Sequence, residues 1–241
     1  PMIHYIIIFF MFLAGINFSL HFHAMSGSIK TYFRDTEFLV YFLIIFLVSS
    51  IILFSLSYQS NTFSDLTIRE SLFGTIAMLT GTGYALGDYE LWPVFLQMIL
   101  LTLMFIGGMG GSTTGGMKVI RILLLVKYAA LETRRMLHSR ALLPVKIGKQ
   151  LIKEDVVRNT LGFFLFFMSA FIISAILLST MGLDMESSIG AAASAMGNIG
   201  PSFGQFGPTD NYALLPDPGK WLLSFCMLSV SYTHLRAHET S

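Results

Sequence analysis

The sequence predicts an all-α integral membrane fold in which long spanning helices alternate with short, re-entrant half-helices. Three observations lead to this prediction. The chain of 241 residues is 54% hydrophobic and only 12% charged, which is about half the charged fraction of a soluble domain. Its apolar residues form long uncharged runs. Between these runs lie short helical patterns that end in glycine-rich turns.

Three apolar runs are long enough to cross a bilayer. The runs at 3–22, 38–57 and 161–181 contain no Asp, Glu, Lys or Arg. Each has about 20 residues, which as a helix corresponds to roughly 30 Å and to the thickness of the hydrocarbon core. A buried helix of a soluble protein usually has only about 10–14 such residues. We therefore expect spanning helices.

The distribution of Lys and Arg predicts which side of the membrane each polar segment faces. Ten of the 15 Lys and Arg residues fall within 118–158, and two more within 26–37. By the positive-inside rule, segments 26–37 and 127–158 are predicted to be cytoplasmic. The stretches 58–91 and 182–219 then open to the other side, and they hold eight acidic residues and one Arg. An acidic mouth would concentrate cations, although ordinary solvated loops explain the same charges.

The two outward-facing stretches share one plan. In each, a spanning run leads to a helical pattern too short to cross, at 68–79 and 185–196, then to a glycine-rich turn and another apolar run. The short helices match best at an offset of 116 residues, whereas the turns superpose Gly83 on Gly200 at an offset of 117. This is a weak internal repeat, and internal repeats are common in transport folds.

The two turns are predicted to form an ion filter. Non-helical backbone occurs at membrane depth only where it is buried in protein or lines a wet cavity. Such a loop can replace the hydration shell of a cation with backbone carbonyls, and each half-helix directs the negative end of its dipole toward the cation. The predicted filter residues are Thr80, Gly81, Thr82, Gly83, Tyr84, Gly197, Asn198, Ile199, Gly200 and Pro201. The carbonyls predicted to hold K⁺ are those of Thr82, Gly83, Asn198, Ile199 and Gly200.

A second glycine-rich segment lies between apolar half-runs at 92–106 and 119–128. Six glycines in ten residues would break any helix that crosses the bilayer, so we expect a mobile intramembrane loop that gates the path below the filter. Lys118 at its end is costly in lipid, by roughly 2.5–3.5 kcal/mol at a helix centre, so it should face the protein interior or a cavity. The predicted gating-loop residues are Gly107, Gly108, Gly110, Gly111, Ser112, Thr113, Thr114, Gly115, Gly116 and Lys118.

Several other function classes have no support in the sequence. A nucleotide-binding P-loop requires Gly directly before Lys and Ser or Thr after it, but Met117 and Val119 flank Lys118. The single cysteine, Cys226, provides no disulfide and no metal site. We therefore expect no enzyme activity, no cofactor and no nucleic-acid partner. Because the chain enters an apolar run directly after Pro1, we also expect a piece of a larger membrane protein.

Several of these segments resemble the Trk/Ktr/HKT family of potassium transporters. The motifs Phe-Ile-Gly-Gly, Gly-Ser-Thr, Gly-Gly and Lys-Val-Ile-Arg within 105–121 resemble the family's third repeat. Segment 195–201 resembles its fourth filter loop, 11–18 resembles the end of its second repeat, and the whole resemblance covers about residues 1–228. It implies potassium uptake across a bacterial inner membrane by a homodimer, with a cytosolic nucleotide-binding Trk subunit on the inner face. It also implies four repeats, each with a first helix M1, a pore loop and a second helix M2.

The resemblance divides the chain into parts of these repeats. Residues 1–25 would be the second helix of repeat two and 26–37 a cytoplasmic linker. Repeat three would occupy 38–130, with M1 at 38–57, a pore helix at 68–79, a filter at 80–84 and a broken M2 at 92–129. After a linker at 131–158, repeat four would occupy 159–230, with M1 at 161–181, a pore helix at 185–196, a filter at 197–201 and a truncated M2 at 219–230.

The last residues depart from the family pattern. Residues 231–241 form a polar tail that is expected to halt the final helix. The family continues here with Gly-Arg-Leu-Glu, whose arginine lies opposite the gating loop, and the tail does not contain this motif. Two other functions also stay open. Broken helices occur in secondary transporters of sodium or another solute, and a membrane scaffold could use its glycines for helix packing alone. In a scaffold, replacing Gly83 or Gly200 by Ala would leave ion flux unchanged.

Overall fold

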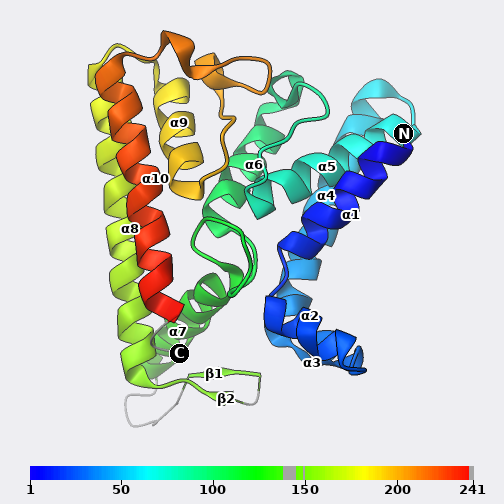
Figure 1. Ribbon diagram of the computed structural model, residues 1–241, viewed down its shortest axis with the longest axis vertical. Helices are drawn as coiled ribbons and strands as arrows, with labels where there is room; N and C mark the ends of the chain where they lie inside the picture. The colour runs from blue at the N-terminus through cyan, green and yellow to red at the C-terminus, as the bar shows by residue number, and fades with distance from the viewer. Residues whose placement is uncertain (138–144, 149, 239–241) are drawn as a thin grey trace.

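The computed structural model describes residues 1–137, 145–148 and 150–238, and it is mainly helical (Figure 1). The helices are α1 (Met2–Ala14), α2 (Phe18–Met25), α3 (Lys30–Arg34), α4 (Thr36–Ser60), α5 (Asp65–Thr80), α6 (Val94–Ile106), α7 (Val119–Leu137), α8 (Glu154–Thr180), α9 (Met185–Gly197) and α10 (Asp217–His238). The remaining elements are the 3-10 turns η1 (Tyr89–Leu91), η2 (Gly204–Phe206) and η3 (Tyr212–Leu214), and a hairpin of β1 (Lys146–Ile147) and β2 (Gln150–Leu151).

Within the described part of the chain, two helices are long and apolar enough to cross a membrane on their own. They are α4 and α8, which contain most or all of the apolar runs predicted at 38–57 and 161–181. The Asp35 carboxylate starts α4 by accepting a 2.8 Å hydrogen bond from the Phe38 amide. Large apolar side chains on both helices face outward, including Phe54 at 75% exposure and Leu165 at 64%. Such surfaces suit lipid contact, and the predicted all-α membrane class is confirmed.

The first apolar run does not form the single helix predicted over 1–25. Helices α1 and α2 meet at an angle of 102°. The Asn17 side chain caps α2 by accepting a 2.8 Å hydrogen bond from the Ser19 amide. A β-carbon at Gly15 would overlap the Tyr41 hydroxyl and lie 2.9 Å from Cγ2 of Thr80. The bend therefore lies directly against the end of α5.

The half-helices α5 and α9 are each packed among three other helices. Helix α5 packs against α1, α4 and α6, and α9 packs against α8, α10 and α6 (Figure 1). Helix α5 begins three residues before the predicted start at 68, because Ser64 accepts a 3.1 Å hydrogen bond from the Thr67 amide and caps it. Helix α9 begins at Met185, and Asp184 caps it through the Ser187 amide. Both half-helices are largely buried.

The core has two large apolar clusters that meet along α6. One cluster joins α1, α4, α5 and α6, and the other joins α8, α9 and α10. Phe105 of α6 packs against both, and its ring contacts the Phe171 ring edge-on at 4.9 Å between centroids. The C-terminal end of α6 therefore joins the cluster that contains the half-helix α5 to the cluster that contains the half-helix α9.

The last helix runs farther than the sequence predicts. Helix α10 continues to His238 rather than stopping near residue 230. Polar side chains do not break a helix as Gly or Pro would, and 229–238 contains neither. Within the predicted cytoplasmic segment 127–158, residues 138–144 and 149 lie outside the described part of the chain, as do 239–241 of the tail.

Candidate ion filter and intramembrane loop

The two half-helices end in the same backbone arrangement. The Thr82 amide donates a 3.0 Å hydrogen bond to the Ala77 carbonyl, and the Ile199 amide donates a 3.0 Å hydrogen bond to the Ser194 carbonyl. Both bonds close a helix end in the Schellman manner, and Asn198 within the second adopts a left-handed φ of 53°. Equivalent residues are 117 apart (194 − 77 and 199 − 82). The turns therefore follow the 117 register rather than 116.

The two turns lie side by side and touch through their backbones. A β-carbon at Gly83, where φ is 71°, would overlap the Ile199 carbonyl oxygen and lie 2.9 Å from Cδ of Pro201. A β-carbon at Gly81 would lie 3.3 Å from the Gly197 carbonyl oxygen. Segments that are more than 100 residues apart in sequence thus meet at one place, and only glycine at position 83 permits this approach.

Most carbonyls of the turns accept no hydrogen bond from the part of the chain that the structure describes. In the described ranges, no hydrogen bond is donated to the carbonyl oxygens of Thr82, Gly83, Asn198 and Ile199. The Gly200 carbonyl differs, because it accepts hydrogen bonds from Ser194 Oγ at 2.9 Å and from the Tyr212 hydroxyl at 2.8 Å. Both lone pairs of this oxygen are therefore used. Among the five carbonyls predicted to hold K⁺, the Gly200 carbonyl is therefore the one that already has two hydrogen-bond donors in the described residues.

The other filter residues take supporting places. Thr80 is the last residue of α5; it is buried, and its Oγ1 lies 2.8 Å from Oγ1 of Thr82. The Asn198 side chain reaches α10, where its Nδ2 donates a 3.4 Å hydrogen bond to the Met227 carbonyl. Tyr84 is 60% exposed. Helix α10 thus braces the second turn.

The glycine-rich segment lies at the junction of the two turns. It connects α6 to α7, and a β-carbon at Gly115 would overlap the Gly197 carbonyl oxygen. A β-carbon at Gly81 would lie 3.7 Å from the Gly115 amide nitrogen. The intramembrane loop therefore contacts the first and second turns together, at the ends of their half-helices.

Lys118 faces the protein interior, as expected from its cost in lipid. It is 6% exposed and has a left-handed φ of 75°. Its Nζ donates to the Thr114 carbonyl, to Thr114 Oγ1 at 2.9 Å and to the Ser112 carbonyl at 3.3 Å. The Gly108 amide donates to the same Thr114 Oγ1 at 3.0 Å. The ammonium group is thus hydrogen-bonded to oxygens of the same loop, and these bonds link Lys118 to Ser112 and Thr114.

The loop is also hydrogen-bonded to the bend between α1 and α2. The Met109 amide donates to the Gly15 carbonyl at 2.9 Å, and the Phe18 amide donates to the Gly111 carbonyl at 3.1 Å. The bend frees these backbone groups from helical pairing. Sequence reasoning missed this contact, because Gly15 and Asn17 could mark a helix break within the run at 3–22 but do not indicate which distant segment meets it.

Acidic side chains gather on the outer face around Glu90. Burial raises the pKa of the Glu90 carboxyl, and the negative charges of Asp88, Glu186 and Asp210 raise it further, against the opposing effect of the Gly204 amide. Asp88 and Glu90 come from the first outward-facing stretch and the other two carboxylates from the second. Of the eight acidic residues predicted at the mouth, these four lie near enough for their charges to interact.

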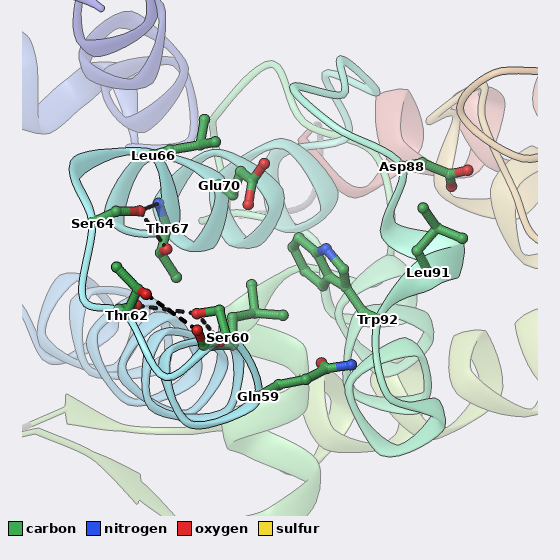
Figure 2. Close-up of a pocket in the computed structure, with 11 residues that line it drawn as sticks. Gln59, Ser60, Thr62, Ser64, Leu66, Thr67, Glu70, Asp88, Leu91 and Trp92 are labelled. Atoms are coloured by element: carbon green, nitrogen blue, oxygen red, sulfur yellow. Dashed lines mark hydrogen bonds between the residues drawn. The ribbon is translucent and has the colours of Figure 1, made fainter.

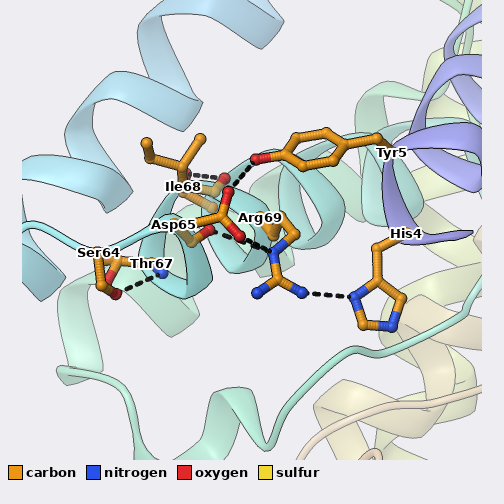
Figure 3. A network of polar contacts seen from close by, with 8 residues as sticks. His4, Tyr5, Ser64, Asp65, Thr67, Ile68 and Arg69 are labelled. Carbon is orange, nitrogen blue, oxygen red and sulfur yellow. Dashed lines mark hydrogen bonds and ion pairs between the residues drawn. The ribbon is translucent and has the colours of Figure 1, made fainter. Parts of the chain in front are cut away.

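A polar network fixes the outer end of α5 against α1 (Figure 3). Arg69 Nε lies 2.8 Å from Asp65 Oδ2, and its Nη1 lies 2.9 Å from His4 Nδ1. The Tyr5 hydroxyl donates to Asp65 Oδ1 at 2.5 Å. The only basic residue of the stretch 58–91 is thus paired with a carboxylate.

A groove on the outer part of the protein lies away from the turns. It has a volume of about 560 Å³ and opens between the outer ends of α4 and α5 and the start of α6 (Figure 2). Ser60, Glu70 and Trp92 line it, and none of the predicted filter residues does. Nor do the described residues include any group of three or more His, Cys, Asp or Glu side chains placed to hold a metal ion.

Comparisons with known proteins agree with this architecture. The chain is 34% identical to the Trk system potassium uptake protein TrkH of Escherichia coli (strain K12), over 95% of this chain and 47% of that protein. It is 36% identical to the Trk system potassium uptake protein TrkH of Vibrio parahaemolyticus, over 94% of this chain and 47% of that protein. The chain thus spans about half the length of the curated relatives it matches.

A solved structure and a family model extend the comparison. The crystal structure of the potassium transporter TrkH from Vibrio parahaemolyticus matches with a TM-score of 0.86 at 33% identity, over 95% of this chain and 49% of that one. The family model named TrkH, described as a cation transport protein, matches residues 1–229. Because this match extends over nearly the whole chain, the chain belongs to the TrkH family of cation transport proteins.

Proposed function

We propose that this chain contributes two of the re-entrant turns that carry potassium ions across a bacterial inner membrane. The observation that supports the proposal best is the contact between the turns at Gly83 and Ile199. Around this contact lie four carbonyls that accept no hydrogen bond from any described residue, those of Thr82, Gly83, Asn198 and Ile199. These carbonyls replace part of the hydration shell of the ion. The names of the relatives, which are potassium uptake proteins, support K⁺ as the ion.

Uptake that concentrates K⁺ some tens of times needs no coupled ion in such a path. A membrane potential of 100 mV supplies about 2.3 kcal/mol per charge. At about 1.4 kcal/mol per tenfold change in concentration, this corresponds to roughly fiftyfold accumulation. The acidic residues around Glu90 raise the local cation concentration at the outer end of the path.

We further propose that the intramembrane loop at 107–118 gates the path. Its contact with Gly197 supports this role, because the loop then lies directly below the filter. Lys118 provides a fixed positive charge on this side, which opposes a cation while the loop is in place. Gating requires the loop to withdraw from Gly197 and to carry Lys118 with it.

The proposed partners lie on the inner face. A cytosolic nucleotide-binding Trk subunit would dock on the basic segments 26–37 and 127–158, and two copies of the full-length protein would form a homodimer. Family membership and the concentration of Lys and Arg in these segments support this arrangement. Pull-down of the full-length protein with such a subunit, with and without nucleotide, tests the docking.

Ion flux tests the proposed function. The full-length protein is reconstituted in liposomes under a potassium gradient, and uptake of K⁺ is competed with Na⁺ and Rb⁺. We expect saturable K⁺ uptake that Rb⁺ inhibits and Na⁺ inhibits weakly. Equal permeation of Na⁺ and K⁺ would overturn the potassium assignment. Exchange of an organic substrate without current would instead favour a secondary transporter.

A further inference from the structure

The Glu37 carboxylate binds both the intramembrane loop and the helix that follows it. Glu37 lies in the first turn of α4 and is 8% exposed. Its Oε1 accepts a 2.6 Å hydrogen bond from the Gly110 amide and a 3.0 Å hydrogen bond from the Ile120 amide. Gly110 lies in the first half of the loop, and Ile120 is the second residue of α7. One oxygen atom thus joins both sides of the loop to a spanning helix.

The two donors have no alternative partner within α7 or the loop. The first amides of a helix lack intrahelical acceptors, so a carboxylate from another helix takes the place of the usual N-cap. A negative charge is also favoured at the N-terminus of α7 by the helix dipole. The contact is close as well as polar, because a β-carbon at Gly110 would lie 3.6 Å from Glu37 Oε1.

Helix α4 does not need Glu37 for its own start. Asp35 already caps α4 through the Phe38 amide. The bonds of Lys118, by contrast, go to Ser112 and Thr114, which belong to the same loop and move with it. Among the charged side chains that contact the loop in the described residues, Glu37 is therefore the one that ties it to a helix outside the loop.

We propose that Glu37 is the positioning residue that holds the intramembrane loop in its closed place. Opening then requires the bonds to Gly110 and Ile120 to break together. This inference rests on the proposed function of the loop as a gate. The inference concerns the equilibrium between the closed and the open loop. It does not concern ion selection by the filter, because the hydrogen bonds of Glu37 in the described residues go to Gly110 and Ile120 and not to a filter residue.

Single-channel recording of the full-length protein in planar bilayers tests the inference. Glu37→Ala removes the acceptor, whereas Glu37→Gln keeps one oxygen but removes the charge. We expect Glu37→Ala to raise the ratio of open to closed time about tenfold, which corresponds to about 1.4 kcal/mol, and Glu37→Gln to lie between it and the wild type. The unitary conductance and the K⁺/Na⁺ permeability ratio should stay unchanged.

A matched control uses the same chemical change at an exposed position. Asp217→Asn, at the start of α10, removes a carboxylate whose side chain is 86% exposed and which no loop residue contacts, so its open time should equal that of the wild type. If Glu37→Ala does not fold, as judged by gel filtration, Glu37→Gln decides the test. Wild-type open times in the folded Glu37 variants, or an altered permeability ratio, would overturn the inference about Glu37 but leave the proposed function standing. A wild-type protein without K⁺ current would overturn the proposed function and the inference with it.

Discussion

The hydroxyl of Tyr89 donates a 2.8 Å hydrogen bond to the carbonyl oxygen of Ser202, 113 residues farther along the chain. The Tyr89 ring is buried and packs edge-on against Phe203, with 5.3 Å between ring centroids. The outer loop of the first half-helix unit thus holds the backbone just after the second turn. Tyr212 holds the same segment from another side through the Gly200 carbonyl.

Removing both hydroxyls should loosen the second turn without removing its packing. In the double variant Tyr89→Phe and Tyr212→Phe, the rings stay, including the stack of Tyr212 on Phe206 at 4.5 Å. Each lost hydrogen bond weakens the turn by about 0.5–1.5 kcal/mol. We expect the K⁺/Na⁺ permeability ratio, measured from reversal potentials, to fall severalfold. Tyr58→Phe, at 79% exposure, is the matched control and should leave the ratio unchanged. An unchanged ratio in the double variant would show that these hydroxyls do not position the filter.

Gly83→Ala should disrupt the contact between the turns. The left-handed φ of 71° costs a residue with a side chain about 1–2 kcal/mol, and the new methyl group overlaps the Ile199 carbonyl oxygen. We expect K⁺ flux into liposomes to fall at least about tenfold, since 1.4 kcal/mol is a factor of ten. Gly162→Ala on α8 meets no atom within 4 Å and is the control. Normal flux in Gly83→Ala would favour a packing role for these glycines.

Lys118→Met should loosen the intramembrane loop. The ammonium group donates to oxygens of Ser112 and Thr114, and hydrogen bonds to charged groups contribute about 1.5–3 kcal/mol each. We expect amide hydrogen exchange within 107–118 to accelerate at least about tenfold. Lys153→Met, at an exposed position, should leave exchange in the loop unaltered. Unchanged protection in Lys118→Met would mean that backbone contacts alone hold the loop.

The raised pKa of Glu90 predicts a pH dependence of stability. Burial is the largest cause of the raised pKa of Glu90, and the negative charges of Asp88, Glu186 and Asp210 raise this pKa further. A carboxyl with a raised folded-state pKa contributes stability below its unfolded pKa, and this contribution is lost as the pH rises through the folded pKa. Glu90→Gln should therefore have a higher Tm than the wild type at neutral pH and no advantage at acid pH. A Tm difference that does not vary with pH would contradict this account.

The half-helices and their turns could be predicted because each has a local signal. A helical pattern shorter than about 20 residues cannot cross the hydrocarbon core, and glycine-rich segments mark where it ends, as at Gly81 and Gly197. The position of Lys118 also followed from its cost in lipid. These arguments need only one segment at a time.

The contacts that position the turns and the loop carry no such signal. Glu37 has a sufficient local explanation, because an acidic residue suits the first turn of any helix. Its partners Gly110 and Ile120 lie 73 and 83 residues away. The bend at Gly15 was missed for a similar reason, since its freed backbone groups are satisfied by the distant residues Met109 and Gly111.

The most direct test of the account is to locate the ion. Crystals of the full-length protein grown with Tl⁺ in place of K⁺ would show the cation by anomalous scattering. We expect anomalous density within coordination distance of the carbonyl oxygens of Thr82, Gly83, Asn198 and Ile199, and none beside the Gly200 carbonyl. Anomalous density only at other places, with these four carbonyls facing solvent or protein donors, would contradict the claim that the two turns form a filter.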